Sequence, residues 1–92
     1  MVHFLVHGKN DNVAVTVQNV RAGTGGLCRN METGEETRVD AAMDIPLGHK
    51  VALAPFSVDD GIIKYNHDIG RVVAPIKAGE HVHVHNVKTR RW

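Results

Sequence analysis

Short apolar runs separated by polar turns extend along the whole chain. Within residues 13–17, valines alternate with Ala14 and Thr16, and this period of two is typical of a half-buried strand. Five other runs rich in β-branched residues lie between turn-forming residues. The pattern therefore predicts short strands at residues 2–7, 13–17, 50–54, 62–65, 70–74 and 81–87.

The segments between these strands carry residues that favour turns. Residues 8–12 form a turn cluster, and residues 24–26 (Thr-Gly-Gly) are expected to be a flexible break. Residues 27–39 are polar and are expected to form a hairpin or an exposed loop. No segment keeps a helical period beyond about two turns. We expect residues 41–43 to form a single helical turn at most, before Pro46.

A weak internal repeat consists of an apolar residue, two further residues and a glycine. Residues 45–48 (Ile-Pro-Leu-Gly) resemble residues 76–79 (Ile-Lys-Ala-Gly), and residues 20–23 (Val-Arg-Ala-Gly) are a poorer copy. Glycine adopts positive φ without steric cost, so it suits a turn of this kind. Independent turns and a real duplication explain the similarity equally well.

Composition strengthens the prediction of an all-β fold. The chain has 14 Val and 5 Ile against 4 Leu, and β-branched side chains pack well on pleated sheets. A length of 92 residues predicts one domain over residues 1–92, with its core in 2–87 and a basic tail in 88–92. Short strands at this spacing favour a small barrel or sandwich.

Charge and cysteine content narrow the class of function. The net charge is +1 and aromatic residues are 4% of the chain, so neither a basic face nor a stacking platform for nucleic acid is expected. Cys28 is the single cysteine, which suits a reducing compartment. The apolar run at residues 2–6 is too short for a signal peptide or a membrane span. We therefore expect a cytoplasmic protein that binds no membrane.

Three of the seven histidines alternate with valines near the C-terminal end, in His81-Val82-His83-Val84-His85. On a strand, the valines would face the core and the histidines the opposite side, roughly 6.6 Å apart. Zinc or iron(II) accepts such ligands, although three successive ones would need a bend in the strand to converge. The spacing equally allows an exposed face without a ligand, or histidines that act as acid–base groups or anion donors.

Two further polar clusters follow predicted turns or strands. His49 and Lys50 come directly after Gly48, and residues 64–68 (Lys-Tyr-Asn-His-Asp) end another strand. Lys64 is suited to hold a carboxylate, although a solvated turn explains either cluster alone. His3 and His7 are interpreted as structural, and Cys28 has no nearby base that would make it a nucleophile.

Taken together, these strings resemble the altronate/galactarate dehydratase family over residues 2–86. The most specific string is Gly79-Glu80-His81-Val82-His83-Val84-His85-Asn86, and the supporting strings are Gly48-His49-Lys50-Val51-Ala52-Leu53, Ile63-Lys64-Tyr65 and Ile69-Gly70. The resemblance implies a compact all-β domain of the SAF or β-clip type with little helix. Residues 2–7, 68–73 and 88–92 are similar to the branch of (2R)-sulfolactate sulfo-lyases, in which the domain is a separate small subunit.

The resemblance also implies a function. It suggests a lyase subunit, inactive alone, that works with a large catalytic subunit to convert (2R)-sulfolactate to pyruvate and sulfite. His83 and His85 would be catalytic, His49, Lys50 and Lys64 would bind the anionic 2-hydroxy acid, and His81, His83 and His85 would ligate a divalent metal, first of all iron(II). Part of that metal's ligation would fall to the large subunit.

Other functions stay open at this stage. The chain is also compatible with a part of a sugar-acid dehydratase, because Asn66 fits neither branch well. A scaffolding or binding module for the large subunit, or a solitary metal-binding protein, would carry the same strings. Unpaired strand edges also allow a homo-oligomer of the isolated chain.

Overall fold

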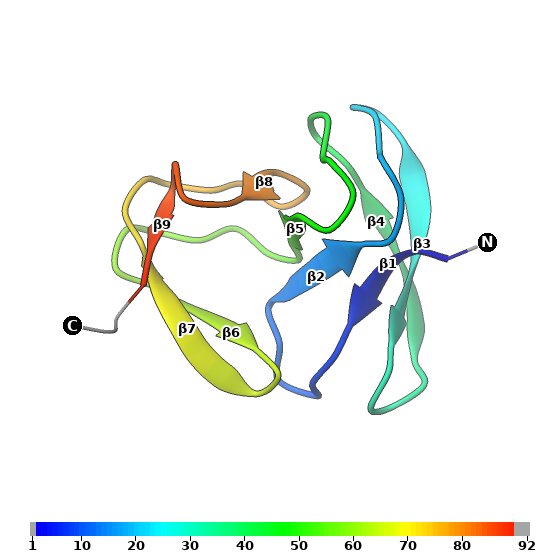
Figure 1. The fold of residues 1–92 in the computed structure, drawn as a ribbon, viewed down its shortest axis with the longest axis horizontal. Helices are drawn as coiled ribbons and strands as arrows, with labels where there is room; N and C mark the ends of the chain where they lie inside the picture. The colour runs from blue at the N-terminus through cyan, green and yellow to red at the C-terminus, as the bar shows by residue number, and fades with distance from the viewer. Residues whose placement is uncertain (1, 90–92) are drawn as a thin grey trace.

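The computed structural model describes residues 2–89, which form nine short strands joined by turns (Figure 1). The strands are β1 (Val2–Val6), β2 (Val13–Thr16), β3 (Gly25–Asn30), β4 (Glu36–Asp40), β5 (Lys50–Ala52), β6 (Gly61–Lys64), β7 (His67–Val72), β8 (His81–Val82) and β9 (Val87–Lys88). The all-β prediction is confirmed. Residues 2–89 contain no helix of the length and apolarity that crossing a membrane requires.

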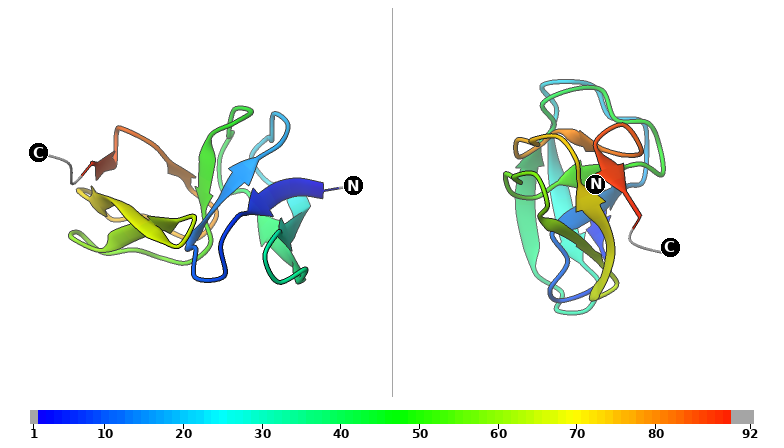
Figure 2. Two further views of the ribbon diagram at one scale, coloured as in Figure 1. Left: turned by 60° about the horizontal axis from the view of Figure 1, so that its bottom comes forward. Right: turned by 90° about the vertical axis from the view of Figure 1, so that its left-hand side faces the viewer.

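The strands form two sheets. The larger sheet has the order β4-β3-β1-β2-β5-β8, and the smaller has the order β6-β7-β9. Strands β1 and β3 are parallel, and all other pairs are antiparallel. The smaller sheet lies at one end of the molecule and β1, β3 and β4 at the other, with β2 and β5 between them (Figures 1 and 2).

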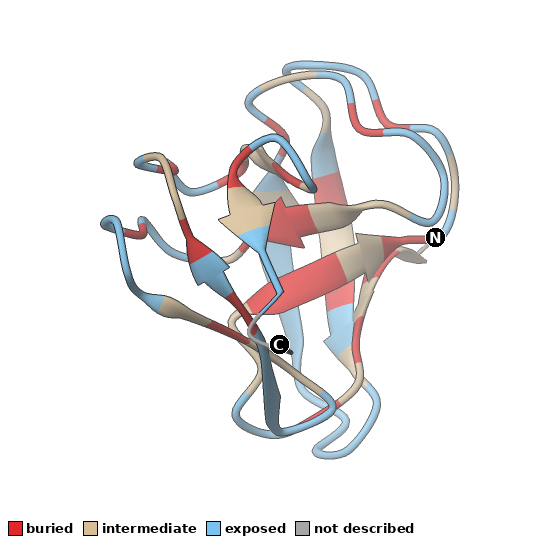
Figure 3. Ribbon diagram, turned by 60° about the vertical axis from the view of Figure 1, so that its left-hand side comes forward, coloured by how far each residue is buried: buried red, intermediate tan, exposed pale blue. Residues whose placement is uncertain are grey.

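Each half of the molecule has its own core. The first core consists of Phe4, Val6, Ala14, Val20, Cys28, Ala41, Ile45 and Val51. The second consists of Val13, Ala52, Phe56, Ile62, Val72, Ile76 and Val82. Adjacent residues of β2 and of β5 divide between the two, because successive side chains of a strand point to opposite faces. These two strands therefore form a shared wall, and both carry buried residues in Figure 3.

The weak sequence repeat corresponds to a repeated turn that occurs four times. Each copy begins with a residue that forms an isolated β-bridge, and the residue three positions later has a positive φ. A strand begins within the next two residues. The φ values are 84° at Gly23, 84° at Gly48, 85° at Gly79 and 77° at Asp59. A positive φ at this position is the mark of a type II turn. Sequence reasoning missed the fourth copy because aspartate replaces glycine there.

The bridges pair these turns two by two, Val20 with Ile45 and Phe56 with Ile76. Each pair closes one core, since all four bridging residues are buried. The repeat therefore has a structural role in closing the two cores. The turn that follows Ile45 lies directly before β5, and it positions His49.

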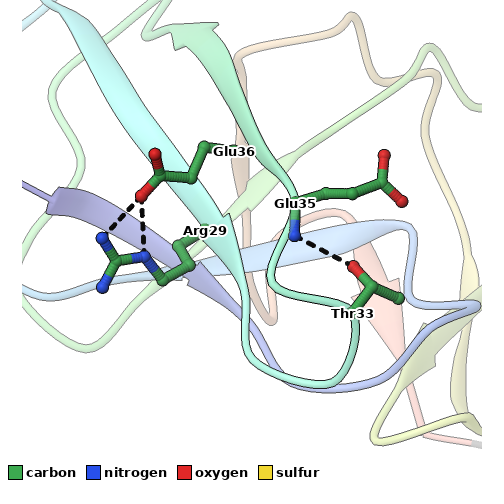
Figure 4. Close-up of polar contacts among 4 residues, drawn as sticks. All are labelled: Arg29, Thr33, Glu35 and Glu36. Atoms are coloured by element: carbon green, nitrogen blue, oxygen red, sulfur yellow. Dashed lines mark hydrogen bonds and ion pairs between the residues drawn. The ribbon is translucent and has the colours of Figure 1, made fainter.

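The polar segment 27–39 lies in the hairpin of β3 and β4. Of the two expectations for this segment, a hairpin or an exposed loop, the hairpin is confirmed. Arg29 donates to Glu36 across the hairpin at 2.8 and 2.5 Å, and the Thr33 hydroxyl accepts the Glu35 N–H in the turn (Figure 4). Strand β4 is the exposed edge of the larger sheet, and its charged side chains disfavour pairing with another strand.

Several local expectations were wrong. Gly25 and Gly26 belong to β3 rather than to a flexible break, and a side chain at Gly26 would collide with His3 and Phe4. Residues 41–43 form no helical turn, because the Ala41 N–H and carbonyl bond to Thr24 and Gly23 instead.

The limits of the remaining strands differ from prediction by a few residues. Strand β7 begins at His67, before the predicted 70–74, because residues 65–66 form a tight turn from β6. In β2 the polar Thr16 is buried (1% exposed), while Val17 is 40% exposed. Of the predicted basic tail over 88–92, residues 90–92 lie outside the described residues.

Candidate functional site

The histidine segment begins as a strand and then turns. Strand β8 covers only His81 and Val82, and residues 83–86 form a turn before β9. The buried Asn86 side chain fixes this turn, because it accepts the His83 N–H at 3.0 Å and donates to the His81 carbonyl at 2.8 Å. The bend that three convergent histidines require is therefore present.

The prediction of a continuous strand over 81–87 was wrong, and so was the burial of both valines. Val82 is fully buried in the second core, but Val84 is 78% exposed at the tip of the turn. The alternation of His and Val looks the same in a strand and in this turn. What ends the strand is the Asn86 side chain, which replaces the ladder hydrogen bonds with bonds of its own.

His49 reaches the same place from a distant part of the chain. It ends the turn 46–49, in which its N–H bonds to the Pro46 carbonyl. Thr16 holds this turn against β2: its N–H bonds to the His49 carbonyl at 2.9 Å, and its carbonyl accepts the Gly48 N–H at 3.0 Å. The buried Thr16 hydroxyl donates to the Pro46 carbonyl at 2.7 Å. Thr16 is a positioning residue that sequence reasoning missed.

Pairing between β5 and β8 brings the histidines together. Lys50 lies opposite Val82, and Val51 lies opposite His81, so one step further along the ladder places His49 across from His83. The His49 and His83 rings stack with centroids 4.3 Å apart, and His49 Nδ1 lies 2.8 Å from His81 Nε2. The His81 and His83 rings lie 5.5 Å apart and nearly parallel.

Three of the four histidines have a geometry suited to a metal ion. One ligand nitrogen each of His49, His81 and His83 lies within 4.8 Å of the others. His85 is more exposed and lies outside this group, with its ring centroid 5.2 Å from that of His81. Three imidazole nitrogens with room for further ligands match a catalytic zinc or iron(II) site.

The surroundings of His81 and His83 favour the neutral form of these two imidazoles. Burial, followed by the positive charges of His49, His85, His83 and Lys50, lowers the pKa of His81 below its ordinary value of 6.5. Burial and the charges of His49, Lys50 and His85 lower the pKa of His83 in the same way. Neutral imidazole is the form that ligates a metal, so the chemistry of this donor set fits a divalent cation.

Of the two lysines predicted to bind substrate, Lys50 lies next to the histidines, and Lys64 lies near Lys50. Lys50 is half-buried, and burial together with the Lys64 charge lowers its pKa. Lys50 and His83 both line a cavity of about 140 Å³, together with Ile69, Val84, Val87 and Thr89. Lys64 ends β6, and its Nζ lies 5.4 Å from the centre of the Tyr65 ring.

The other histidines and the cysteine lie elsewhere. His3 accepts the Leu27 N–H at 3.4 Å, and His7 stacks on Tyr65 with ring centroids 4.4 Å apart. His67 is exposed at the start of β7. Cys28 is buried in the first core, where burial raises its pKa although the Thr37 hydrogen bond opposes the shift, so it is not an activated thiol.

The fold and the cluster define a small all-β domain that presents four histidines and Lys50 near one end of its β5–β8 ladder. The family model described as the altronate/galactarate dehydratase SAF domain matches residues 2–90. The chain belongs to this family, and the resemblance seen in the sequence is confirmed.

Individual relatives fall into two groups. The chain is 45% identical to the (2R)-sulfolactate sulfo-lyase subunit alpha of Chromohalobacter salexigens over 99% of this chain and 98% of that protein. It is 47% identical to the protein of the same name from Paracoccus pantotrophus, over 72% of this chain and 98% of that one. It is 36% identical to the altronate dehydratase of Bacillus subtilis over 97% of this chain, which corresponds to 17% of that enzyme.

Proposed function

We propose that this chain is the small subunit of a two-component carbon–sulfur lyase that converts (2R)-sulfolactate to pyruvate and sulfite. The observation that carries the proposal is the convergence of His49, His81 and His83 in a chain with end-to-end similarity to sulfo-lyase alpha subunits. The sugar-acid alternative is less well supported, since the similarity to altronate dehydratases is lower and covers a small part of them.

The proposed metal ligands are His49, His81 and His83, and the metal to test first is iron(II). This set replaces His85 of the sequence-based assignment with His49, whose ligand nitrogen lies closer to the other two. A bound divalent cation supplies Lewis-acid stabilisation of negative charge on the substrate's carboxylate and hydroxyl oxygens. These three histidines would fill three coordination positions of the metal, and the remaining positions would be available to the substrate or to the large subunit.

The reaction is a β-elimination. A base takes the proton from C2, the electron pair of that C–H bond forms the C2–C3 double bond, and the C3–S bond breaks with its electrons leaving on sulfite. The resulting enol of pyruvate then tautomerises. With His83 assigned to metal binding, His85 is the histidine left to move a proton. Lys50 and Lys64 supply positive charge for the anionic substrate, while His49 serves as a metal ligand.

The proposal includes a large catalytic partner and a cytoplasmic location. Two relatives are named as alpha subunits, and altronate dehydratases carry the matching region within a chain about six times longer, since it is 17% of their length. The three histidines that lie together are only partly buried in this chain, which supports an active site completed by a second subunit. A single buried, free cysteine suits a reducing compartment.

Sulfite release from (2R)-sulfolactate by the co-purified complex of this chain and its large subunit tests the proposal. We expect His81→Ala to lose metal and at least about 100-fold in turnover, because removing one of three ligands opens the site. His85→Ala should retain metal but lose turnover, while the exposed His67→Ala serves as the matched control. Full activity of both variants in an intact complex would disprove the site. Loss of assembly instead of turnover would indicate a scaffolding role.

A further inference from the structure

Within the part of the chain that the structure describes, Lys50 has no ion-pair partner of opposite charge. Across residues 2–89, ion pairs join Arg29 to Glu36, Arg38 to Asp40 and Arg71 to Asp59, and none of them involves Lys50. Its side chain is half-buried, and Lys64 approaches it as a second positive charge. Two cations held near each other in a partly buried position are stabilised by binding an anion.

The cavity beside Lys50 has room for such an anion. Its volume of about 140 Å³ is several times the ~30 Å³ that one water molecule occupies in the liquid. Its walls are apolar on the side of the smaller sheet, where Ile69 of β7 and Val87 of β9 line it. Lys50, His83 and Thr89 provide the polar groups, so an anion with a short apolar body matches the lining.

The cavity and the histidine cluster share His83. Lys50 lies opposite Val82, on the second-core face of the β5–β8 ladder, while His49 and His81 share the other face. His83 follows the end of β8 and contributes to both places. A molecule with two anionic ends, separated by a short carbon chain, can therefore place one end at the histidines and the other at Lys50.

We infer that the cavity lined by Lys50, His83, Ile69, Val84, Val87 and Thr89 is a subsite for the sulfonate end of a doubly charged substrate. Lys64, which lies outside this lining, adds a second positive charge near Lys50. The assignment rests on the proposed function and adds which end of the substrate lies where. It makes Lys50 the residue that binds the leaving group, at the carbon where sulfolactate carries its sulfonate. The departing sulfite, still an anion, would leave from the same subsite.

The experiment measures inhibition of the two-subunit enzyme by two fragments of the substrate. Methanesulfonate represents the sulfonate end, and lactate represents the carboxylate and hydroxyl end. In Lys50→Met, which keeps the apolar stem, we expect the KM for sulfolactate and the inhibition constant of methanesulfonate to rise about ten- to a hundredfold, as for loss of a charged hydrogen bond. The inhibition constant of lactate should change less than twofold.

Two further variants make the result specific. Lys50→Arg retains the charge and should restore most of the affinity for methanesulfonate. Lys77→Met removes the charge of an exposed lysine outside the cavity and should change neither constant. An unchanged methanesulfonate constant in an active Lys50→Met enzyme would overturn the subsite while leaving the proposed function intact.

A second measurement separates this inference from the proposed function. Titration of the full chain, in complex with its partner, with methanesulfonate should shift the methyl resonances of Ile69, Val84 and Val87, and Lys50→Met should abolish the shifts. If the complex releases no sulfite from sulfolactate yet shows these shifts, the proposed reaction fails and the anion subsite holds. If the shifts are also absent, both fail.

Discussion

Asn86 shows how one buried amide shapes the site. The residue is 6% exposed, and its side chain accepts the His83 N–H while donating to the His81 carbonyl. Both bonds are to the backbone of the histidines, not to their imidazole rings. Without it, residues 81–85 would be free to continue as a strand, with their side chains spread roughly 6.6 Å apart. Asn86 is therefore a positioning residue for the metal ligands.

Asn86→Ala should weaken zinc or iron(II) binding at least tenfold and lower the free energy of unfolding by about 1–2 kcal/mol, because it leaves two partly buried backbone groups unpaired. Calorimetric titration with zinc and urea unfolding measure the two effects. Asn86→Asp keeps the acceptor for His83 and should lose less affinity than the alanine variant. Undiminished zinc affinity in Asn86→Ala would show that the turn forms without this side chain.

Sequence reasoning at the scale of single residues singled out side chains that the structure brings together, but not their arrangement. His49, Lys50, His81 and His83 were all singled out, and the structure brings them together. The link between His49 and His83 depends on the β5–β8 register, which local patterns do not encode. The alternation of valines with Ala14 and Thr16 placed Thr16 on the face opposite the valines, whereas the structure buries it, so no local signal pointed to its role.

The element that approaches the site from the smaller sheet is the β6–β7 hairpin. Tyr65 and Asn66 both have positive φ, 53° and 61°, as a tight type I′ hairpin turn requires. The Asp11 carboxylate accepts their N–H groups at 2.9 and 2.7 Å, and it also accepts the Gly8 N–H. Asp11 thus compensates the strain of two non-glycine residues and ties the hairpin to the 8–12 turn.

Asp11 makes stability depend on acid pH. Burial tends to raise its pKa, but hydrogen bonds from the backbone of Asn66, Gly8, Tyr65 and His7 outweigh this and lower it below the ordinary 3.8. The native state therefore holds this proton less tightly than the unfolded chain, so the stabilisation is complete above about pH 4 and is lost as the pH falls through the lowered pKa.

Asp11→Asn should lower the free energy of unfolding by about 1–3 kcal/mol near neutral pH, because it replaces a charged acceptor of several N–H groups. The difference from the unmodified chain should shrink below pH 4, and urea unfolding at both pH values measures it. Asp60→Asn, which removes one exposed carboxylate that accepts only the Ser57 N–H, is the matched control. Equal losses in the two variants would contradict the role of Asp11.

At the scale of the whole molecule, the turn at Gly79 joins the two halves. Its N–H bonds to the Ala52 carbonyl, and its own carbonyl accepts the Ala42 N–H from the segment after β4. Gly23 has nearly the same φ, 84° against 85°, but open space around it. A Cβ at Gly79 would instead collide with the Asp40 carbonyl oxygen.

Alanine substitutions at Gly23 and Gly79 distinguish the cost of backbone strain from the cost of a steric collision. Gly23→Ala should cost about 1–2 kcal/mol, the penalty for a left-handed conformation. Gly79→Ala should cost that amount and a further ~1–3 kcal/mol for the collision. Chemical denaturation of both variants measures the difference, and equal costs would show that the halves separate slightly without penalty.

For the molecule as a whole, the sequence was sufficient to predict the fold class but not the arrangement of the strands. The excess of Val and Ile over Leu and the spacing of the turns were sufficient to predict an all-β domain. The division into two sheets was not predictable, because it depends on pairings such as Phe56 with Ile76 and on the parallel contact of β1 with β3. Such long-range pairings leave no local periodicity in the chain.

The division into two cores also sets an order of events during synthesis. Every residue of the first core lies within positions 4–51, whereas the second core needs Val82 to join Val13. At about 5–20 residues per second, the ribosome delivers the second set a few seconds after the first. The amino-terminal half can thus collapse early and present His49 on a preformed edge. The histidine segment then docks last, so the site is completed only when nearly the whole chain has emerged.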